Sequence, residues 1–474
     1  MTNGKEYSWL SDFIIRQSEL KNNQQYYQLM ENIDRIGLSR LNRLIQIFDK
    51  RVKDLSLQYL SGSGSSSYFP KPEEENYINV DWIPKILSKN QFSIIESGMK
   101  QRAVAFNKFL KAHYEGRDLI VPKEIIESSK LQVKENKNLN FFNDIYVHLY
   151  GIDLVTNRDG EFIVLEDNLG FPGGLGYSQE IRRITRQIIP ELFSNYQIAN
   201  TDSFSLEIYN TLASLSPNKT EKPIIIFLQR GPGSVDRVEH RLLTNESRIT
   251  LVDPEDLIFE TNGKVFVRMG DDTLTQVDVI YTRLSPRFNE INRKLSYALS
   301  YGKVSVVTHQ GNMLPGDKAI FPYIPDLIRH YLNEEPILKQ PKTYWLANEH
   351  RLSWAIDNIE SLVIKSRSGL GGKQVLIGPE ADSETIMKWK NLIVSSPNEY
   401  IAQELVDFTR FILWNRDLKH ITTEYTDLRM YALIGKGNKV TVYKGGMSRF
   451  GSSNSQKVNV SLGGGLKDIW IEED

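Results

Sequence analysis

The stretch "EFIVLEDNLGFPGG", Glu161 to Gly174, joins an apolar run to a glycine/proline turn through three polar residues. These residues are Glu166, Asp167 and Asn168. The segment before it, "YGIDLVTNRDG", reads as a second strand, and "NRDG" is typical of a tight turn. The sequence therefore predicts a β-hairpin whose return strand ends in two carboxylates and an amide.

Side-chain alternation divides these polar residues between two faces of the hairpin. Residues two apart on a strand point the same way, so Glu166 and Asn168 share a face and Asp167 points away. Asp153 lies on the paired strand and is expected to join the face of Glu166. Carboxylate and amide oxygens suit Mg²⁺, so Asp153, Glu166 and Asn168 are candidate metal ligands. A solvated strand end followed by a turn is the alternative, and Asp167 is expected to be structural.

Two later segments carry residues suited to a nucleotide. "VIKSRSGLGGKQV" places Lys365 on a strand before a glycine-rich loop. Glycines let backbone N–H groups approach phosphate oxygens, and lysines add positive charge. The spacing is not that of a P-loop, and an ordinary hairpin is the alternative. "YIAQELV" puts Gln403 and Glu404 after another apolar strand, where they are candidates to contact an adenine and a ribose.

A third segment, "DLRMYAL", places Arg429 on a strand. The guanidinium fork suits a phosphate or a carboxylate. A surface ion pair with Asp427 is the alternative.

Composition narrows the class of protein. The chain has 474 residues, of which 40% are hydrophobic, enough for about two to four domains. With 58 basic and 59 acidic residues, the chain has no overall positive charge that would favour binding to nucleic acid or to an anionic membrane. The absence of cysteine excludes disulfides, thiolate nucleophiles and cysteine-based zinc sites. No apolar run has the length of a membrane span and no signal-peptide pattern is present, so we expect a cytoplasmic protein.

The coarse secondary structure changes along the chain. Apolar residues at three- and four-residue spacings predict helices over 25–60 and 91–114. From residue 223 strands alternate with helices, which predicts a small parallel α/β domain over 216–340. From residue 362 the pattern is strand-rich again.

Together these segments resemble the ATP-grasp superfamily. Asp153, Glu166 and Asn168, followed by "FPGG", are similar to the metal-ligand motif of D-alanine–D-alanine ligase-type enzymes. Lys365 and its loop resemble the nucleotide-binding lysine and the loop that covers the phosphates. "AQELV" resembles the adenine-binding hinge, and "DLRMYAL" resembles the strand that bears a phosphate-facing arginine.

The order of the motifs narrows the resemblance. In ordinary ATP-grasp chains the lysine precedes the metal ligands, whereas here it follows them. The chain thus resembles the circularly permuted ATP-grasp type 2 family and, more distantly, glutathionylspermidine synthase. Further family-like segments are "MKQRAVAFNKFL", "PGGLGYSQEIRR", "RVEHRLL", "DVIYTRL", "GDKAIFPYIPDLIRHYLNEEPIL" and "GGGLKDIWI". Ser285, Pro286 and Arg287 depart from the acidic residues common in the family, which implies either a more anionic substrate or a loop variation.

The resemblance implies an α/β (α+β) fold, namely a circularly permuted ATP-grasp fold with a Rossmann-like pre-ATP-grasp domain and an N-terminal helical region. The expected parts are the helical region 1–140, a metal-ligand part 141–215, the Rossmann-like domain 216–340 and a nucleotide-binding part 341–474.

The implied activity is that of an ATP-dependent carboxylate–amine ligase. It would form an amide or peptide bond through an acyl phosphate and release ADP and phosphate, with ATP and Mg²⁺ as cofactors. The expected substrates are a small-molecule or peptide carboxylate and an amine, with no nucleic acid or membrane partner, and a homodimer is one candidate assembly. A phosphotransferase and a non-catalytic nucleotide-binding partner protein are the alternatives. The sequence does not identify the substrates.

The resemblance also assigns residues to roles. Arg429 faces the phosphoryl group, and Arg283, His240 and Lys467 are candidates on the substrate side. A structural histidine on a helix is the alternative for His240. The candidate nucleotide-binding residues are Lys365, Lys318, Ser368, Gly369, Gly371, Gly372, Lys373, Gln403 and Glu404.

Overall fold

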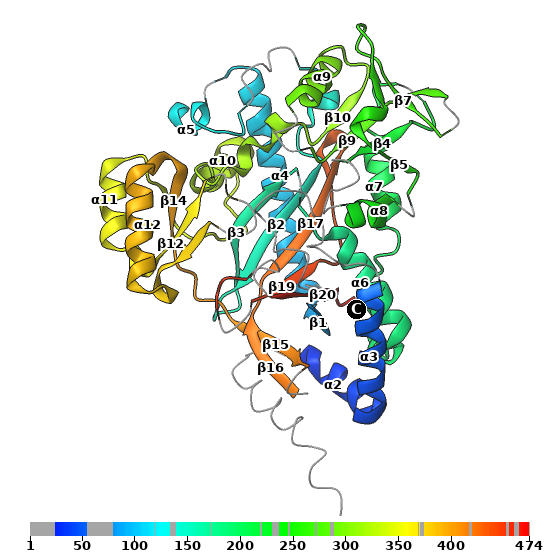
Figure 1. The fold of residues 1–474 in the computed structure, drawn as a ribbon, viewed down its shortest axis with the longest axis vertical. Helices are drawn as coiled ribbons and strands as arrows, with labels where there is room; N and C mark the ends of the chain where they lie inside the picture. The colour runs from blue at the N-terminus through cyan, green and yellow to red at the C-terminus, as the bar shows by residue number, and fades with distance from the viewer. Residues whose placement is uncertain are drawn as a thin grey trace, which may run out of the picture.

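The structure of the chain is a computed structural model (Figure 1). It describes residues 24–54, 79–117, 119–132, 139–170, 172–218, 220–229, 237–244, 247–270, 273–284, 289–367, 369, 374–416, 420–451, 455–458 and 464–473.

A seven-stranded sheet runs through the centre of the fold, in the order β1-β20-β19-β17-β2-β3 with β18 on β17 (Figure 1). Its strands are β1 (Asn79–Leu87), β2 (Leu149–Thr156), β3 (Phe162–Leu169), β17 (Leu428–Gly435), β18 (Lys439–Val442), β19 (Met447–Phe450) and β20 (Gly465–Ile471). β1 and β20 pair in parallel, whereas β2, β3, β17 and β19 pair antiparallel with their neighbours. Early and late segments of the described chain therefore meet in this large sheet.

β2 and β3 form the predicted hairpin. Asp153 lies directly opposite Glu166, and Gly151 lies opposite Asn168. The register shifts after Asp153, because Leu154 pairs with Val164. This bulge is consistent with Asp153, Glu166 and Asn168 sharing one face, which confirms the expected geometry.

Helices pack on both faces of the large sheet. α4 (Lys89–Tyr114) covers the face opposite Asp153, and a capping box between Ser88 and Gln91 fixes where it begins. α6 (Leu175–Ile188) starts on the Asp153 face, where the Ser178 hydroxyl donates to the carbonyl of Gly446 at 2.7 Å. The hairpin face that carries Asp153 and Glu166 is therefore the face that does not pack against α4.

A four-stranded parallel sheet, in the order β10-β9-β4-β5, confirms the predicted α/β region. Its strands are β4 (Ile225–Leu228), β5 (Ile249–Val252), β9 (Val279–Thr282) and β10 (Ser305–Val307), and its helices include α7 (Phe204–Ala213), α8 (Arg237–Thr244) and α9 (Asn289–Ser300). A three-stranded antiparallel sheet, which was not expected from the sequence, is made of β6 (Leu257–Phe259), β7 (Val265–Arg268) and β8 (Leu274–Gln276).

A fourth sheet, in the order β11-β14-β12-β13, lies at the left of Figure 1 beside two helices. We call it the small sheet. Its elements are β11 (Thr343–Trp345), β12 (Leu362–Ser366), β13 (Val375–Ile377), β14 (Tyr400–Glu404), α11 (Glu349–Asp357) and α12 (Ser383–Ser395). The remaining helices and strands are α5 (Lys123–Glu127), α10 (Ile324–Leu332), β15 (Arg410–Asn415) and β16 (His420–Tyr425).

The N-terminal region differs from the expectation in two ways. The predicted helix over 25–60 is two helices, α2 (Gln24–Ile36) and α3 (Leu38–Asp54), because Gly37 takes a left-handed φ of 75°. Residues 55–60 lie outside the described residues. β1 is a strand inside the range 1–140, which the sequence had suggested was helical.

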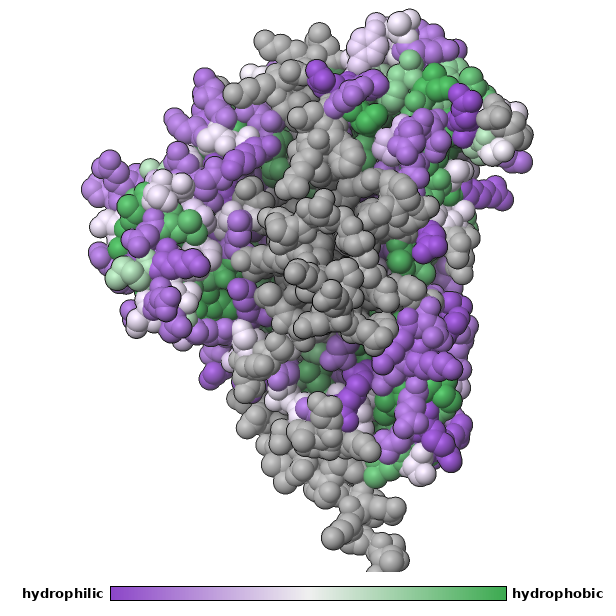
Figure 2. Space-filling model, in the orientation of Figure 1, coloured by the Kyte–Doolittle hydropathy of each residue, from purple (hydrophilic) through white to green (hydrophobic). Residues whose placement is uncertain are grey.

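None of the helices in the described ranges is long and apolar enough to cross a bilayer. On the face drawn in Figure 2 the described surface is mostly hydrophilic, with scattered hydrophobic patches.

Asp167 joins the large sheet to α4. Arg102 of α4 donates from Nε to Oδ1 of Asp167 at 2.9 Å and from Nη2 to Oδ2, and both side chains are 1% exposed. The Tyr150 hydroxyl adds a hydrogen bond at 2.5 Å. These contacts support the expectation that Asp167 is structural.

Replacing Asp167 with alanine should destabilise the protein strongly. The Arg102 guanidinium would remain buried without its counter-ion, which costs about 3–5 kcal/mol. Urea unfolding followed by circular dichroism measures the loss. Glu31→Ala is the control, because Glu31 forms an exposed pair with Arg35 worth less than about 1 kcal/mol. Equal unfolding midpoints for the two variants would contradict the assignment.

Candidate functional site

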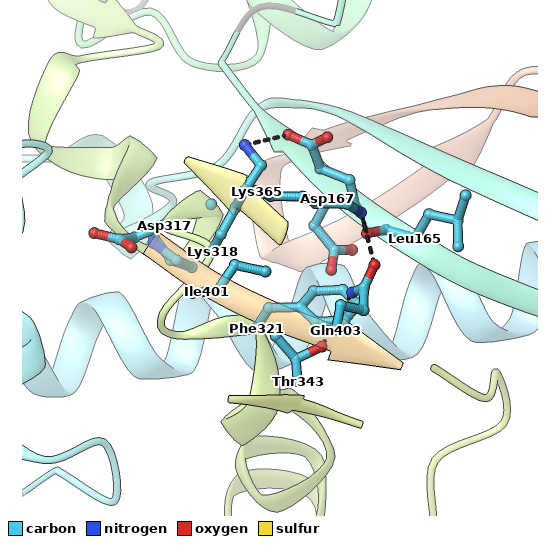
Figure 3. Close-up of a pocket in the computed structure, with 12 residues that line it drawn as sticks. Leu165, Asp167, Asp317, Lys318, Phe321, Thr343, Lys365, Ile401 and Gln403 are labelled. Carbon is cyan, nitrogen blue, oxygen red and sulfur yellow. Dashed lines mark hydrogen bonds and ion pairs between the residues drawn. The ribbon is translucent and has the colours of Figure 1, made fainter. Parts of the chain in front are cut away.

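A narrow cleft that is partly open to solvent lies between the large sheet and the small sheet. Its lining includes Glu166 of β3, Lys318, Lys365 of β12 and Gln403 of β14. Figure 3 shows Lys318, Lys365 and Gln403 arranged around this space. The structure therefore brings the hairpin predicted from one part of the sequence next to the lysine segment predicted from another.

Lys318 connects the two halves of the cleft. Its ammonium Nζ lies 2.9 Å from Oε1 of Glu166 and donates to the carbonyl of Gly369 at 2.9 Å. Glu166 belongs to the hairpin, and Gly369 belongs to the glycine-rich loop after β12. One positive charge thus contacts both a candidate metal ligand and the loop expected to cover phosphates.

Lys365 is held at the floor of the cleft. Its Nζ donates to Oε1 of Gln403 at 2.7 Å and approaches the carbonyl of Leu165 at 3.5 Å. Gln403 is fixed in turn, because its Nε2 donates to the Thr343 hydroxyl at 3.0 Å. Burial lowers the pKa of Lys365 to about 8, although the nearby Glu166 carboxylate favours its charged form.

A buried ion pair fixes the spacing of the two lysines. Arg367, two residues after Lys365, donates from Nε to Oδ1 of Asp317 at 2.6 Å, and Asp317 directly precedes Lys318. The guanidinium also donates to the Ser128 hydroxyl at 2.9 Å and lies over the Trp345 ring. This pair therefore couples the small sheet to the segment that carries Lys318.

Asp153 is engaged by two arginines. Arg429, its neighbour on β17, donates from Nε and Nη2 to the two carboxylate oxygens at 2.6 Å each. Arg449 of β19 donates from Nη2 to Oδ2 of Asp153 at 2.9 Å. Burial alone would raise the pKa of Asp153, but the two guanidiniums hold it below its usual range. The alternative pair of Arg429 with Asp427 is wrong, because Asp427 pairs with Arg449.

The donor set fits a magnesium ion in part. Asp153 and Glu166 are cross-strand neighbours, and Asn168 lies opposite Gly151 two residues farther along β3. Two carboxylates and an amide are suitable Mg²⁺ ligands. Within the described part of the chain no three acidic or histidine side chains converge on one point, so the amide would be needed as a ligand. Asp153 would have to exchange a guanidinium hydrogen bond for the cation.

The "PGG" turn brings Arg283 close to Arg429. The carbonyl of Gly173 accepts from Nη1 of Arg429 at 3.3 Å. The Gly174 N–H donates to Oε1 of Glu239 at 2.5 Å, and Oε2 of Glu239 lies 3.2 Å from Nη1 of Arg283. Gly174 has a φ of 108°, which explains a glycine here. Arg283 therefore sits beside the turn that follows the hairpin, at the end of β9.

Three candidate residues lie elsewhere. His240 is fully buried, and its ring packs against Phe227 at 4.5 Å. Lys467 is fully buried in an ion pair with Asp81 at 3.0 Å, on the sheet face opposite Asp153. Glu404 is the last residue of β14, and its Oε1 lies 3.8 Å from Nζ of Lys342. Among the described residues that line the cleft none of these three is included, although Glu404 directly follows the lining residue Gln403.

Other candidates lie outside the described residues. They are Ser368, Gly371, Gly372 and Lys373 of the loop, and Ser285, Pro286 and Arg287 after β9.

The sequence reading missed several residues of the site. They are Arg449, which pairs with Asp153, Glu239, which pairs with Arg283, and Arg367, which pairs with the cleft-lining Asp317. The position of Arg449 in "GGMSRFG" gave no signal, because four strand residues between glycines show little periodicity. Arg367 could have been predicted, because it lies two residues after Lys365 and strand alternation places both side chains on the same face.

Comparisons with known proteins agree with this geometry. A family model described as circularly permuted ATP-grasp type 2 matches residues 84–451. An uncharacterized protein of Synechocystis sp. is 31% identical over 412 residues, covering 84% of this chain and 85% of that protein. "Putative glutamate–cysteine ligase 2-2" of Frankia casuarinae is 29% identical over 462 residues, covering 94% of this chain and 52% of that protein. The chain thus spans about half the length of this second relative.

A solved structure shares the fold. The apo form of a glutathione synthetase-like effector from Globodera pallida superposes with a TM-score of 0.58 at 14% identity. The match covers 88% of this chain and 96% of that chain.

Lys365 should titrate near pH 8 rather than above 10, because its ammonium is buried. NMR of the ¹³Cε or ¹⁵Nζ nuclei of labelled lysine, assigned with Lys365→Arg, measures the midpoint. Glu166→Gln removes a carboxylate that favours the charged form, so it should move the midpoint lower. A midpoint near that of an exposed lysine, or an upward shift in Glu166→Gln, would contradict this picture of the cleft.

Proposed function

Because the chain belongs to the circularly permuted ATP-grasp type 2 family, we propose that it is an ATP-dependent ligase joining a carboxylate to an amine. The observation that carries the proposal is the position of Lys318 between Glu166 and the Gly369 carbonyl. A cation at this point can bind phosphate oxygens between the glycine-rich loop and the candidate metal ligands. The proposal therefore puts a nucleoside triphosphate along the cleft between the large and small sheets.

In this proposal the cleft residues have separate tasks. Lys365 and Lys318 hold phosphate oxygens, and Gln403 keeps Lys365 in position through its hydrogen bond. The loop residues Ser368, Gly369, Gly371, Gly372 and Lys373 cover the phosphates and exclude water, as in other enzymes that protect reactive intermediates. Gln403 and Glu404 end β14, where an adenine and a ribose would lie.

Magnesium bound by Asp153, Glu166 and Asn168 would neutralise charge on the β- and γ-phosphates. The oxygen donors of these side chains and the cross-strand position of Asp153 and Glu166 support this assignment.

The proposed reaction has two steps. A carboxylate oxygen of the substrate attacks the γ-phosphorus of ATP, so that an oxygen–phosphorus bond forms, the bridging bond to the β-phosphate breaks and ADP leaves. The amine then attacks the acyl phosphate, phosphate leaves with the bonding electrons, and the amine nitrogen loses a proton to solvent. Arg429 would neutralise charge on the transferred group, and the enzyme acts mainly by positioning and electrostatics.

The substrate side is proposed near the "PGG" turn. Arg283 and Glu239 lie beside Gly173 and form an ion pair with each other. The name of the Frankia relative suggests an amino acid or a short peptide as the carboxylate. We also propose the four-part division at 1–140, 141–215, 216–340 and 341–474, with β1 as a strand of the first part that joins the large sheet.

The test is analysis of products. Purified protein with Mg·ATP and a pool of amino acids and short peptides should release ADP and phosphate together with a new amide, detected by mass spectrometry. A phosphotransferase would instead give a stable phosphorylated product without free phosphate. Absence of any Mg·ATP binding by calorimetry would contradict both enzyme hypotheses.

Glu166→Gln should lower turnover by about 100-fold or more, because it removes a charge expected to act on the metal and on Lys318. Circular dichroism should show an intact fold. Glu161→Gln is the matched control: Glu161 precedes the same strand but pairs with Lys339 at the surface, so ATP consumption should remain unchanged. Full activity of Glu166→Gln would rule out the metal assignment.

A further inference from the structure

Four buried charges surround the Asp153 face of the large sheet. We call Asp153, Asp427, Arg429 and Arg449 the charge quartet. Their side chains are at most 15% exposed, and the ion pairs between them run from β2 through β17 to β19. Two carboxylates and two guanidiniums sum to zero, so the quartet is neutral as it stands.

Asp153 is the shared member of the quartet. It accepts two hydrogen bonds from Arg429 and one from Arg449, so both of its oxygens are occupied. A cation that takes Asp153 must displace at least one of these bonds. The displaced guanidinium would then stay buried without that acceptor, which is costly unless a new anion replaces it.

Asp427 anchors Arg449 independently of Asp153. Its Oδ1 accepts the backbone N–H of Arg449 at 2.9 Å, and its Oδ2 accepts Nε at 2.8 Å and also Nη2. Arg449 therefore keeps its position when Asp153 is withdrawn. A guanidinium already held in place needs little reorganisation to bind an anion.

Arg429 is tethered differently. Besides Asp153, it donates to the carbonyl of Gly173 at 3.3 Å, and no carboxylate other than Asp153 pairs with it among the described residues. Losing Asp153 would thus leave Arg429 with a single weak carbonyl contact, whereas Arg449 would retain a carboxylate. The two arginines are not equivalent, and Arg449 is the better preorganised.

We propose that Arg449, anchored by Asp427, is a phosphate-binding residue: it shares Asp153 with Arg429 in the absence of nucleotide and binds the triphosphate when a divalent cation takes Asp153. The inference rests on the proposed function, because it takes Mg·ATP binding at this face as given. Binding of the cation and of the nucleotide is then coupled through Asp153. A cation alone would leave the quartet with excess positive charge, and the triphosphate supplies the compensating negative charge.

The coupling gives Arg449→Met two effects of opposite sign. Without nucleotide, Mn²⁺ should bind more tightly than to the unmodified protein, because a guanidinium competing for Asp153 is gone. With nucleotide, the Kd for the magnesium complex of the non-hydrolysable analogue AMP-PNP should rise by about 10- to 100-fold, the value of one charge-assisted hydrogen bond. Electron paramagnetic resonance measures the first quantity and calorimetry the second. Loss of packing alone would weaken both.

The control is Asp468→Asn. Asp468 forms a comparably buried ion pair with Arg182 on β20 and α6, so this variant should lose stability while both affinities stay unchanged. Should Arg449→Met fail to fold, Asp427→Asn keeps Arg449 but loosens its anchor. It should weaken Mg·AMP-PNP binding by a smaller factor than the loss of Arg449.

The outcomes separate the inference from the function on which it rests. Opposite shifts in Arg449→Met, or weaker nucleotide binding in Asp427→Asn, support the role of Arg449. Unchanged Mg·AMP-PNP affinity in a folded Arg449→Met or in Asp427→Asn overturns that role alone. Failure of the unmodified protein to bind Mg·AMP-PNP overturns the proposed function and this inference together.

Discussion

The carboxylate of Asp153 is the interaction on which the arrangement of the site depends. It joins β2 to β17 and β19 through two guanidiniums, all three groups being largely buried. Buried charges need well-aligned partners, so the side chains on this face have little freedom. The strand register carries the alignment, because Arg429 lies directly opposite Asp153. Backbone pairing and charge pairing therefore reinforce each other in placing the candidate ligands.

Neighbouring acids on the hairpin illustrate how one strand serves two purposes. Glu166 points to the cleft and meets Lys318, whereas Asp167 points to α4 and meets Arg102. The alternation of a strand is enough to separate them. The same segment thus contributes to a site that must stay accessible to ligands and to a core that excludes water.

Local periodicity predicted the hairpin, the shared face of Asp153 and Glu166, and the parallel sheet, because each depends on rules that act within a few residues. β1 was not predicted, because it carries the charged residues Asp81 and Lys85. Both are buried in the fold, where they pair with Lys467 and Thr426, which are more than three hundred residues away in the sequence. The role of Arg449 was not predicted for a similar reason. Its partners are distant in sequence, and a single sequence does not show which distant residues meet.

The position of β20 has a consequence for the order of folding. This strand lies between β1 and β19, although it follows β1 by more than three hundred residues of chain. Until it is synthesised, β19 has a free edge and Asp81 lacks the ammonium of Lys467. Pairings of such long sequence separation form slowly. The β1–β20 pairing closes a long loop of chain, so we expect it to form later in folding than the local hairpin of β2 and β3.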